Sequence, residues 1–305
     1  MGRTGSEISG VIAVEPQGLK RLWRLLWRTF LVAFEDNCFG IAKGAAYSAL
    51  VAFFPVLASL AAILVQAHAE SVSHLISQFL VGVVPPGSEE LVQYEFAIRG
   101  QRPAWLIGIA AVLSLWGASG AMISLMEGFQ AAYRLPAGRP FLKQRLMAIL
   151  MTFTLAIPAL GASFLILFGA RLEPMFYQQL GFAVEGEQLR TGVRILASLA
   201  RYLIALGTVI LVTGLLYYFG PNTSLKLRKV WPGALVATFF WGITTGAFAW
   251  YVRNIANYNV MYGSIGAVIA LLVWMYLLAV IALLGCEFNA DMERQSIRQS
   301  AVPRP

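Results

Sequence analysis

Six long apolar runs constrain this chain more than any other feature, because each is long enough to cross a lipid bilayer. A transmembrane helix needs about 20 apolar residues to cross about 30 Å of hydrocarbon. The runs that meet this length are residues 44–66, 104–126, 146–170, 195–219, 230–252 and 265–285. The sequence therefore predicts an all-α, polytopic membrane protein with six transmembrane helices.

The composition supports lipid as the solvent of this chain. Of its 305 residues, 58% are hydrophobic and only 12% are charged, whereas a soluble domain carries about 25% charged residues. The net charge of +8 does not indicate nucleic acid as a partner, because the basic residues collect in alternate loops and form no basic stripe. The first forty residues lack a cleavable signal pattern, so we expect the first membrane helix to direct insertion.

The distribution of Lys and Arg predicts the orientation of the chain. The N-terminal segment, the second and fourth loops and the C-terminal tail carry sixteen of these residues, and the other three loops carry six. Loops rich in Lys and Arg stay in the cytoplasm during insertion. We therefore expect both termini to be cytoplasmic.

Residues 19–34 have the pattern of an amphipathic helix. Lys20, Arg24 and Arg28 recur every four residues, and Trp23 and Trp27 lie on an apolar opposite side. This pattern predicts a helix that lies flat on the inner leaflet, in contact with membrane lipids and their anionic headgroups. The alternative is a cytoplasmic helix packed against loops.

The rest of the chain divides into three regions. We expect a cytoplasmic segment with the amphipathic helix at 1–43, a six-helix transmembrane domain at 44–291 and a polar, frayed tail at 292–305. Within the external loops, residues 74–84 predict an interfacial helix, and residues 171–194 predict a short external segment.

Few residues suit enzymatic chemistry. The two histidines, His68 and His74, lie on different sides of a helix, and Cys38 and Cys286 lack a metal-binding spacing. The sequence has no Gly-rich phosphate loop and no nucleophile elbow. We therefore expect a protein that is not an enzyme and holds no metal or cofactor.

Charges near the membrane are the better functional candidates, because a charge in hydrocarbon is costly unless it faces a cavity or a partner. Arg201 lies six residues into the fourth apolar run, where it either faces a cavity or extends to the outer interface. Lys43 and Glu287 lie at similar depth at the inner ends of the first and last runs. They form either an ion pair or, in the preferred interpretation, separate solvated charges.

Prolines and a polar hairpin are further candidates for transport or gating. Pro55 and Pro158 fall in the middle of two runs, where each removes a backbone donor and kinks the helix. The turn between the last two runs is unusually polar. It includes Asn254, Asn257, Tyr258, Asn259 and Tyr262. These side chains either cap the helix ends, the preferred interpretation, or form a polar gate.

Two glycine pairs predict close helix contacts. Gly242 and Gly246 form one GxxxG motif, and Gly40 and Gly44 form another. Such motifs allow two helices to approach closely, either within one chain or across a homo-oligomer.

Three stretches resemble the YihY/BrkB family of bacterial inner-membrane proteins, some of which carry a ribonuclease BN label. They read GAAYSALVAFFPVLASLAAIL, LWGASGAMISLMEGFQAAYRL with RPFLKQRL, and YYFGPNTSLKLRKVWPGALVATFF continuing to GCEFNADMER. The resemblance implies six helices, cytoplasmic termini and no settled reaction, with export of a lipid or envelope component as a family-level suggestion. The positions that match its motifs are Tyr47, Pro55, Pro221, Asn222, Pro232, Gly233, Tyr258, Asn259, Tyr262, Gly263, Gly266, Glu287 and Asn289.

Three functions are compatible with this sequence. The leading hypothesis is an inner-membrane protein that transports or translocates a lipid or envelope component. The second is a non-catalytic membrane scaffold for envelope proteins. The third, a membrane-associated ribonuclease, depends on the inherited label, because Glu127, Glu287, Asp291 and Glu293 are too few and too scattered for a two-metal site.

Overall fold

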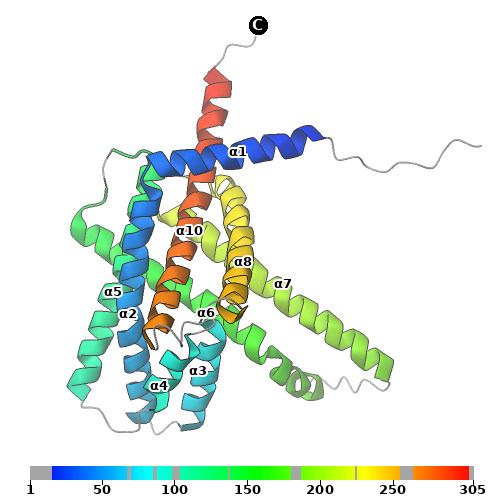
Figure 1. Ribbon diagram of the computed structural model, residues 1–305. Coiled ribbons are helices and arrows are strands. Elements are labelled where there is room, and N and C mark those ends of the chain that lie inside the picture. The colour runs from blue at the N-terminus through cyan, green and yellow to red at the C-terminus, as the bar shows by residue number, and fades with distance from the viewer. Residues whose placement is uncertain are drawn as a thin grey trace, which may run out of the picture.

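The computed structural model describes residues 16–66, 70–84, 88–97, 104–136, 138–179, 187–223, 225–254 and 264–301. All regular structure in these ranges is helical (Figure 1). The α-helices are α1 (Pro16–Glu35), α2 (Cys38–Gln66), α3 (Glu70–Val83), α4 (Glu89–Ala97), α5 (Ala104–Ala132), α6 (Phe141–Gln179), α7 (Glu187–Phe219), α8 (Trp231–Asn254) and α10 (Ser264–Ala301). A short 3-10 helix, η1 (Leu227–Lys229), precedes α8.

Six segments in the described ranges are long and apolar enough to cross a membrane, which confirms the predicted architecture. They are Cys38–Ile63, Trp105–Ala132, Phe141–Ile166, Ile195–Phe219, Leu227–Asn254 and Ile265–Ile297. The end of the bundle that carries α1 and the last turns of α10 is called the inner end below, and the opposite end is the outer end. The cytoplasmic location of the inner end stays a prediction from the charge distribution.

Helix α10 lies at the centre of the bundle and contacts α1, α2, α5 and α8 (Figure 1). Helices α2 and α5 pack most closely, and small residues explain why. A Cβ atom on Gly44 would lie 3.6 Å from Ser124 Oγ, and one on Gly117 would meet Ala52. Small side chains let two membrane helices approach until their backbones are in van der Waals contact.

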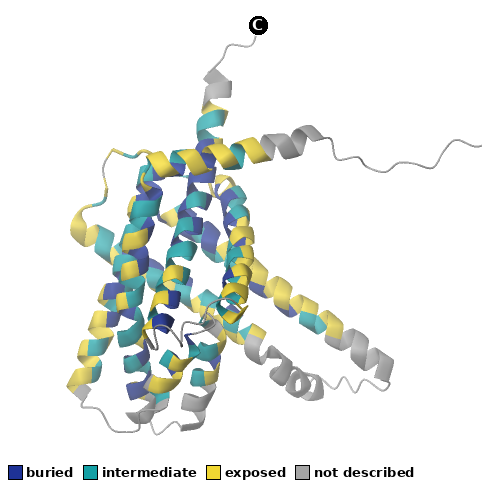
Figure 2. Ribbon diagram, viewed as in Figure 1, coloured by how far each residue is buried: buried dark blue, intermediate teal, exposed yellow. Residues whose placement is uncertain are grey.

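Helices α6 and α7 form an antiparallel pair that joins the core with its inner half. Met151 on α6 and Tyr217 on α7 belong to the buried core cluster. Toward the outer end the pair slants away from the other helices, and its surface is largely exposed (Figure 2). There it touches α3, where the rings of Phe79 and Phe164 lie 6.3 Å apart. We call this arrangement the α6–α7 pair.

Several helix ends differ from the predicted ones. Helix α2 begins at Cys38 and α6 at Phe141, before the start of each apolar run. The predicted external segment at 171–194 is largely helical, because α6 continues to Gln179 and α7 begins at Glu187. Polar residues extend these helices because water and headgroups solvate their side chains, so an apolar run underestimates helix length.

Two further expectations change in the outer loops and the tail. The predicted helix at 74–84 is present as α3, and a second short helix, α4, follows it. The tail was expected to be frayed from residue 292, but α10 continues as a helix to Ala301. This prediction was wrong because charged side chains of the tail form contacts with the bundle, as described next.

Candidate functional site

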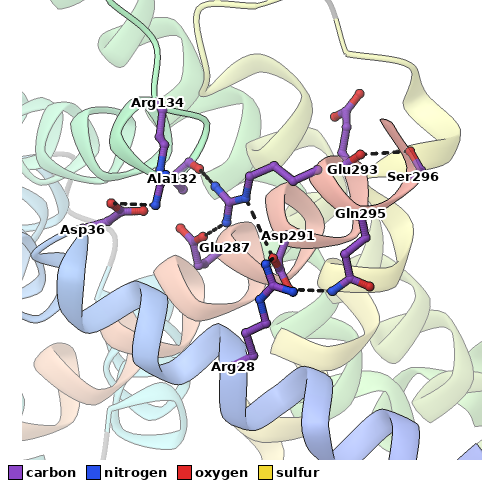
Figure 3. Close-up of polar contacts among 10 residues, drawn as sticks. Arg28, Asp36, Ala132, Arg134, Glu287, Asp291, Glu293, Gln295 and Ser296 are labelled. Carbon is purple, nitrogen blue, oxygen red and sulfur yellow. Dashed lines mark hydrogen bonds and ion pairs between the residues drawn. The ribbon is translucent and has the colours of Figure 1, made fainter. Parts of the chain in front are cut away.

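The last turns of α10 carry a buried group of charges at the inner end (Figure 3). Glu287, Asp291 and Arg294 are spaced four and three residues apart, so they lie on one side of the helix. The side chains of Glu287 and Asp291 are fully buried, and that of Arg294 is 23% exposed. We call these three residues the inner-end cluster.

Arg294 connects α10 to the end of α5. Its Nη2 donates a hydrogen bond to Glu287 Oε1, and its Nη1 donates to the carbonyl oxygen of Ala132 at 2.8 Å. Ala132 is the last residue of α5, where the backbone carbonyls lack helical partners and the helix dipole is negative. One guanidinium therefore neutralises a buried carboxylate and caps a helix.

Asp291 connects α10 to α1. Its Oδ1 lies 3.4 Å from Arg28 Nη2, and its Oδ2 accepts a hydrogen bond from Gln295 Nε2 at 2.9 Å (Figure 3). A second ion pair joins Arg134, just after α5, to Asp36, between α1 and α2, at 3.8 Å. Arg28 was predicted to face lipid, but its side chain contacts α10.

A phenol lies beside this cluster. Burial is the main cause of the raised pKa of Tyr133, and the nearby Cys286, Glu293 and Glu287 add to it. Tyr133 therefore stays neutral at physiological pH. Its hydroxyl is buried and has no hydrogen-bond partner among the described residues.

Asn289 fixes the start of α8 from another helix. Its Oδ1 accepts a hydrogen bond from the backbone N–H of Gly233 at 2.6 Å, and its Nδ2 donates to the carbonyl oxygen of Val230 at 2.9 Å. The first N–H groups of a helix have no partner within the helix, and this side chain supplies one from α10. The close approach requires Gly233, because a Cβ atom there would collide with the Gly285 carbonyl oxygen.

Aromatic side chains add two more bonds to α10. Tyr217 on α7 is fully buried, and its hydroxyl donates to the carbonyl oxygen of Ala282 at 2.8 Å. Trp241 on α8 donates its Nε1–H to the carbonyl oxygen of Leu278 at 3.0 Å. Both bonds satisfy polar side-chain atoms that would be costly to leave unpaired in a membrane.

The structure corrects the predictions for Lys43 and Glu287. Lys43 is exposed on α2, whereas Glu287 is fully buried and paired with Arg294. The two neither form the ion pair considered nor are both solvated. The register between distant helices determines this pairing, and the sequence of either helix alone does not contain it.

Arg201 lies on α7 in the outer half of the α6–α7 pair. It is 9% exposed, within the candidate span Ile195–Phe219. Its Nη2 donates to Ser198 Oγ at 3.1 Å, and its Cζ lies 5.9 Å from the ring centroid of Tyr202. The predicted intramembrane charge is thus largely covered by protein.

Several other predicted residues have structural positions. Pro55 and Pro158 lie inside α2 and α6, and Ser59 Oγ donates a hydrogen bond to the Pro55 carbonyl oxygen at 2.7 Å. Asn254 caps the end of α8 by donating to the Trp250 carbonyl oxygen at 2.8 Å.

The remaining motif residues lie at helix junctions. Pro221 is buried and Asn222 is exposed in the turn after α7, Pro232 lies in the first turn of α8, and Gly266 is buried in the first turn of α10. Proline suits the first helical turn, where its missing N–H costs nothing. Other predicted positions lie outside the described residues. They are Asn257, Tyr258, Asn259, Tyr262 and Gly263.

The two GxxxG motifs have different surroundings. Gly44 faces Ser124 of α5, and a Cβ atom on Gly40 would collide with the side chain of Asn37. A Cβ atom on Gly242 or Gly246 would meet nothing within 4 Å. The pair on α8 therefore makes no close helix contact with the described residues, and a contact between copies stays a prediction.

The described acidic residues and cysteines do not gather into a metal-binding group. No set of three or more His, Cys, Asp or Glu residues in these ranges is arranged to hold a metal ion. In the inner-end cluster, the guanidinium of Arg294 lies between the two carboxylates. The cluster therefore joins helices. The positive charge between its two carboxylates is the guanidinium of Arg294, in the position that a metal cation would take in a metal site.

The comparison with known families agrees with this architecture. A sequence profile of the family described as virulence factor BrkB matches residues 29–304, which include all six spans. The chain belongs to the BrkB family. The resemblance seen in its motifs is thus confirmed.

Relatives of this BrkB-family chain carry two kinds of name. A ribonuclease-like protein of Bacillus subtilis (strain 168), YfkH, is 32% identical over 198 residues, which cover 64% of this chain and 68% of YfkH. A UPF0761 membrane protein of Xanthomonas campestris pv. campestris (strain B100) is 26% identical over 92% of this chain. The chain spans 63% of the length of that relative. No solved structure matches the chain.

Sequence reasoning missed most of the inner-end cluster. The sequence points to Glu287, but it places Arg294 in a tail predicted to fray and offers Asp291 only as a metal ligand of the ribonuclease alternative. The spacing of Glu287, Asp291 and Arg294 was the available signal, because three charges on one side of a helix rarely lack partners. The contact of Arg28 with Asp291 had no signal in the sequence.

Proposed function

We propose that this BrkB-family protein lies in the bacterial inner membrane and moves an anionic lipid or envelope component between the two leaflets. The proposal is carried by one observation, the nearly buried guanidinium of Arg201 within a membrane span. An ionisable group at this depth is costly and is typically found on the path of a substrate or ion. A guanidinium attracts phosphate because its donors match two phosphate oxygens.

The packing of the α6–α7 pair supports the proposal. Its inner half contributes Met151 and Tyr217 to the buried core, whereas its outer half carries exposed side chains such as Leu199 and Leu203. A helix pair held at one end can swing about that end, since few packed contacts oppose the motion of the other. In this proposal the outer half swings, and Arg201 meets a headgroup between the pair and the bundle.

The experiment is a lipid-scrambling assay in proteoliposomes with fluorescent phosphatidylglycerol. We expect the wild-type protein to speed scrambling above that of empty vesicles and Arg201→Ala to abolish the increase. Arg201→Lys keeps the positive charge and should retain part of the increase in scrambling. The matched control is Arg253→Ala, which removes an exposed cation near the outer end of α8. Equal scrambling with and without the protein would refute the proposal.

A scaffold is the second candidate, favoured by the helical extension of α10 beyond the bundle (Figure 1). If the protein is a scaffold, vesicles with and without it should scramble lipid at the same rate. Envelope proteins should co-purify with it, and this co-purification should be lost when residues 296–305 are removed.

The ribonuclease-like name of YfkH suggests the third candidate, a membrane-associated ribonuclease. Metal-dependent RNA cleavage by the purified protein, lost in Asp291→Ala, would support it.

A further inference from the structure

Helix α1 has three distinct sides in the described part of the helix. Thr29 and Ala33 are 3% and 0% exposed and face the bundle. Arg24, Arg28 and Glu35 form an exposed charged side. The third side, called the aromatic side below, is large and exposed. It consists of Trp23, Trp27, Phe30 and Phe34, which are 67%, 57%, 42% and 72% exposed; Leu31, 48% exposed, lies at its border with the charged side.

These sides indicate the surroundings of the helix. A helix that packs on a protein in water needs one apolar side and one polar side. An additional exposed side of large aromatic residues has an unfavourable contact with water. A helix at the surface of a bilayer meets three media, namely protein, acyl chains and water. The three sides of α1 match these three media.

The aromatic side continues onto a membrane-spanning helix. The ring centroids of Phe30 and Phe34 lie 5.5 and 6.2 Å from that of Phe39, in the first turn of α2. Lys43, Tyr47 and Val51 follow Phe39 at intervals of four residues, a spacing that forms an exposed stripe winding slowly around α2. Tyr47 and Val51 are 66% and 48% exposed. This stripe faces lipid in a membrane, and the aromatic side of α1 meets its start at Phe39, so the aromatic side faces the same medium.

Lys43 lies on this lipid-facing stripe, one helical turn after Phe39, and is exposed. At the edge of the span, its ammonium group reaches the depth of lipid phosphates along a flexible, apolar stem. A cation at this depth attracts anionic headgroups.

We propose that α1 lies in the interfacial layer of the leaflet at the inner end, with its aromatic side against acyl chains, and that Lys43 binds the phosphate of anionic lipids there. Figure 1 shows α1 lying across the inner ends of the spans, as this position requires. The proposal does not depend on lipid translocation. The ion pair of Arg28 with Asp291 sets the rotation of α1 about its axis.

The depth of α1 is tested with spin labels at adjacent residues. Cys38 and Cys286 are free and buried, so both are first replaced by Ala. Labels are then placed at Phe34→Cys or at Glu35→Cys in vesicles of phosphatidylethanolamine and phosphatidylglycerol. We expect the first label to collide more with oxygen and the second with a water-soluble nickel chelate. Preference of both labels for the nickel chelate would overturn the proposal.

The role of Lys43 is tested with spin-labelled phosphatidylglycerol and phosphatidylcholine in the same vesicles. Loss of one surface cation lowers the preference for an anionic lipid by up to about fivefold, and we expect this loss in Lys43→Gln. The control is Lys229→Gln, because Lys229 is already paired with Glu293 at 2.6 Å. An unchanged preference in Lys43→Gln, with the protein still monodisperse, would show that Lys43 binds no anionic headgroup.

Discussion

The inner end of the bundle and the outer half of the α6–α7 pair differ in how they are held. At the inner end, side chains of α1 and α7 bond to α10, and side chains of α10 bond to the backbones of α5 and α8. In the outer half, α6 and α7 pack on each other, with Phe164 meeting α3. Among the described residues, the inner end is thus joined by buried polar bonds, whereas the outer half makes fewer contacts with the rest of the bundle.

This difference has a physical cause in the membrane. Lipid gives no hydrophobic gain when two apolar helices associate, so packing and polar bonds decide which helices stay together. Buried hydrogen bonds concentrate where α10 passes the inner ends of the other helices. We infer that the inner end is the fixed part of the protein and that the outer half of the α6–α7 pair is the part that moves.

The largest expected effect is that of Arg294→Ala. It leaves the fully buried Glu287 without its cation, and such a change costs about 3–5 kcal/mol of unfolding free energy. The control, Lys229→Ala, removes a half-exposed pair and should cost less than about 1 kcal/mol. Unfolding in mixed micelles by added SDS measures both. Equal losses would contradict a special role of the inner-end cluster.

Substitution of one leucine in each region by alanine compares how tightly the two regions are packed. Leu283 on α10 is fully buried in the core, whereas Leu203 in the outer half of α7 is 58% exposed. We expect Leu283→Ala to lower the unfolding free energy by about 2–4 kcal/mol, since it leaves a cavity. Leu203→Ala should change it by less than about 0.5 kcal/mol. The same SDS titration measures both, and a similar loss in the two variants would show that the outer half is packed as tightly as the core.

Two glycines of α8 provide the next comparison. A Cβ atom on Gly233 would collide with the α10 backbone, whereas one on Gly242 would meet open space. We expect Gly233→Ala to cost about 2–3 kcal/mol and Gly242→Ala to be neutral or stabilising by up to about 1 kcal/mol. Thermal unfolding in detergent measures the stability change of both variants. If Gly242→Ala were as destabilising as Gly233→Ala, α8 would pack differently from the structure.

The smallest of these effects is expected for Asn289→Ala. It leaves the N–H of Gly233 and the carbonyl oxygen of Val230 without their partner, at a cost of about 1–2 kcal/mol. Asn222→Ala, in an exposed turn, should stay within about 0.5 kcal/mol. Thermal unfolding again measures both. A neutral Asn289→Ala would mean that water satisfies the start of α8.

The sequence predicts the six spans well because length and hydrophobicity alone decide whether a helix can cross the membrane. It predicts helix ends less well, since the solvated ends of helices such as α6 and α10 are polar. The partner of Glu287 was missed because Arg294 lies beyond the apolar run, where the chain was expected to fray. The slant of the α6–α7 pair has no sequence signal, since it results from packing between helices distant in the sequence.

The most direct test of this account compares distance distributions at the two ends by double electron–electron resonance in proteoliposomes. In a background lacking Cys38 and Cys286, one labelled pair joins Trp105 and Leu196 at the outer end, and the other joins Phe219 and Met292 at the inner end; all four side chains are exposed. We predict a broad distribution for the outer pair and a narrow one for the inner pair. Equally narrow distributions would contradict the account.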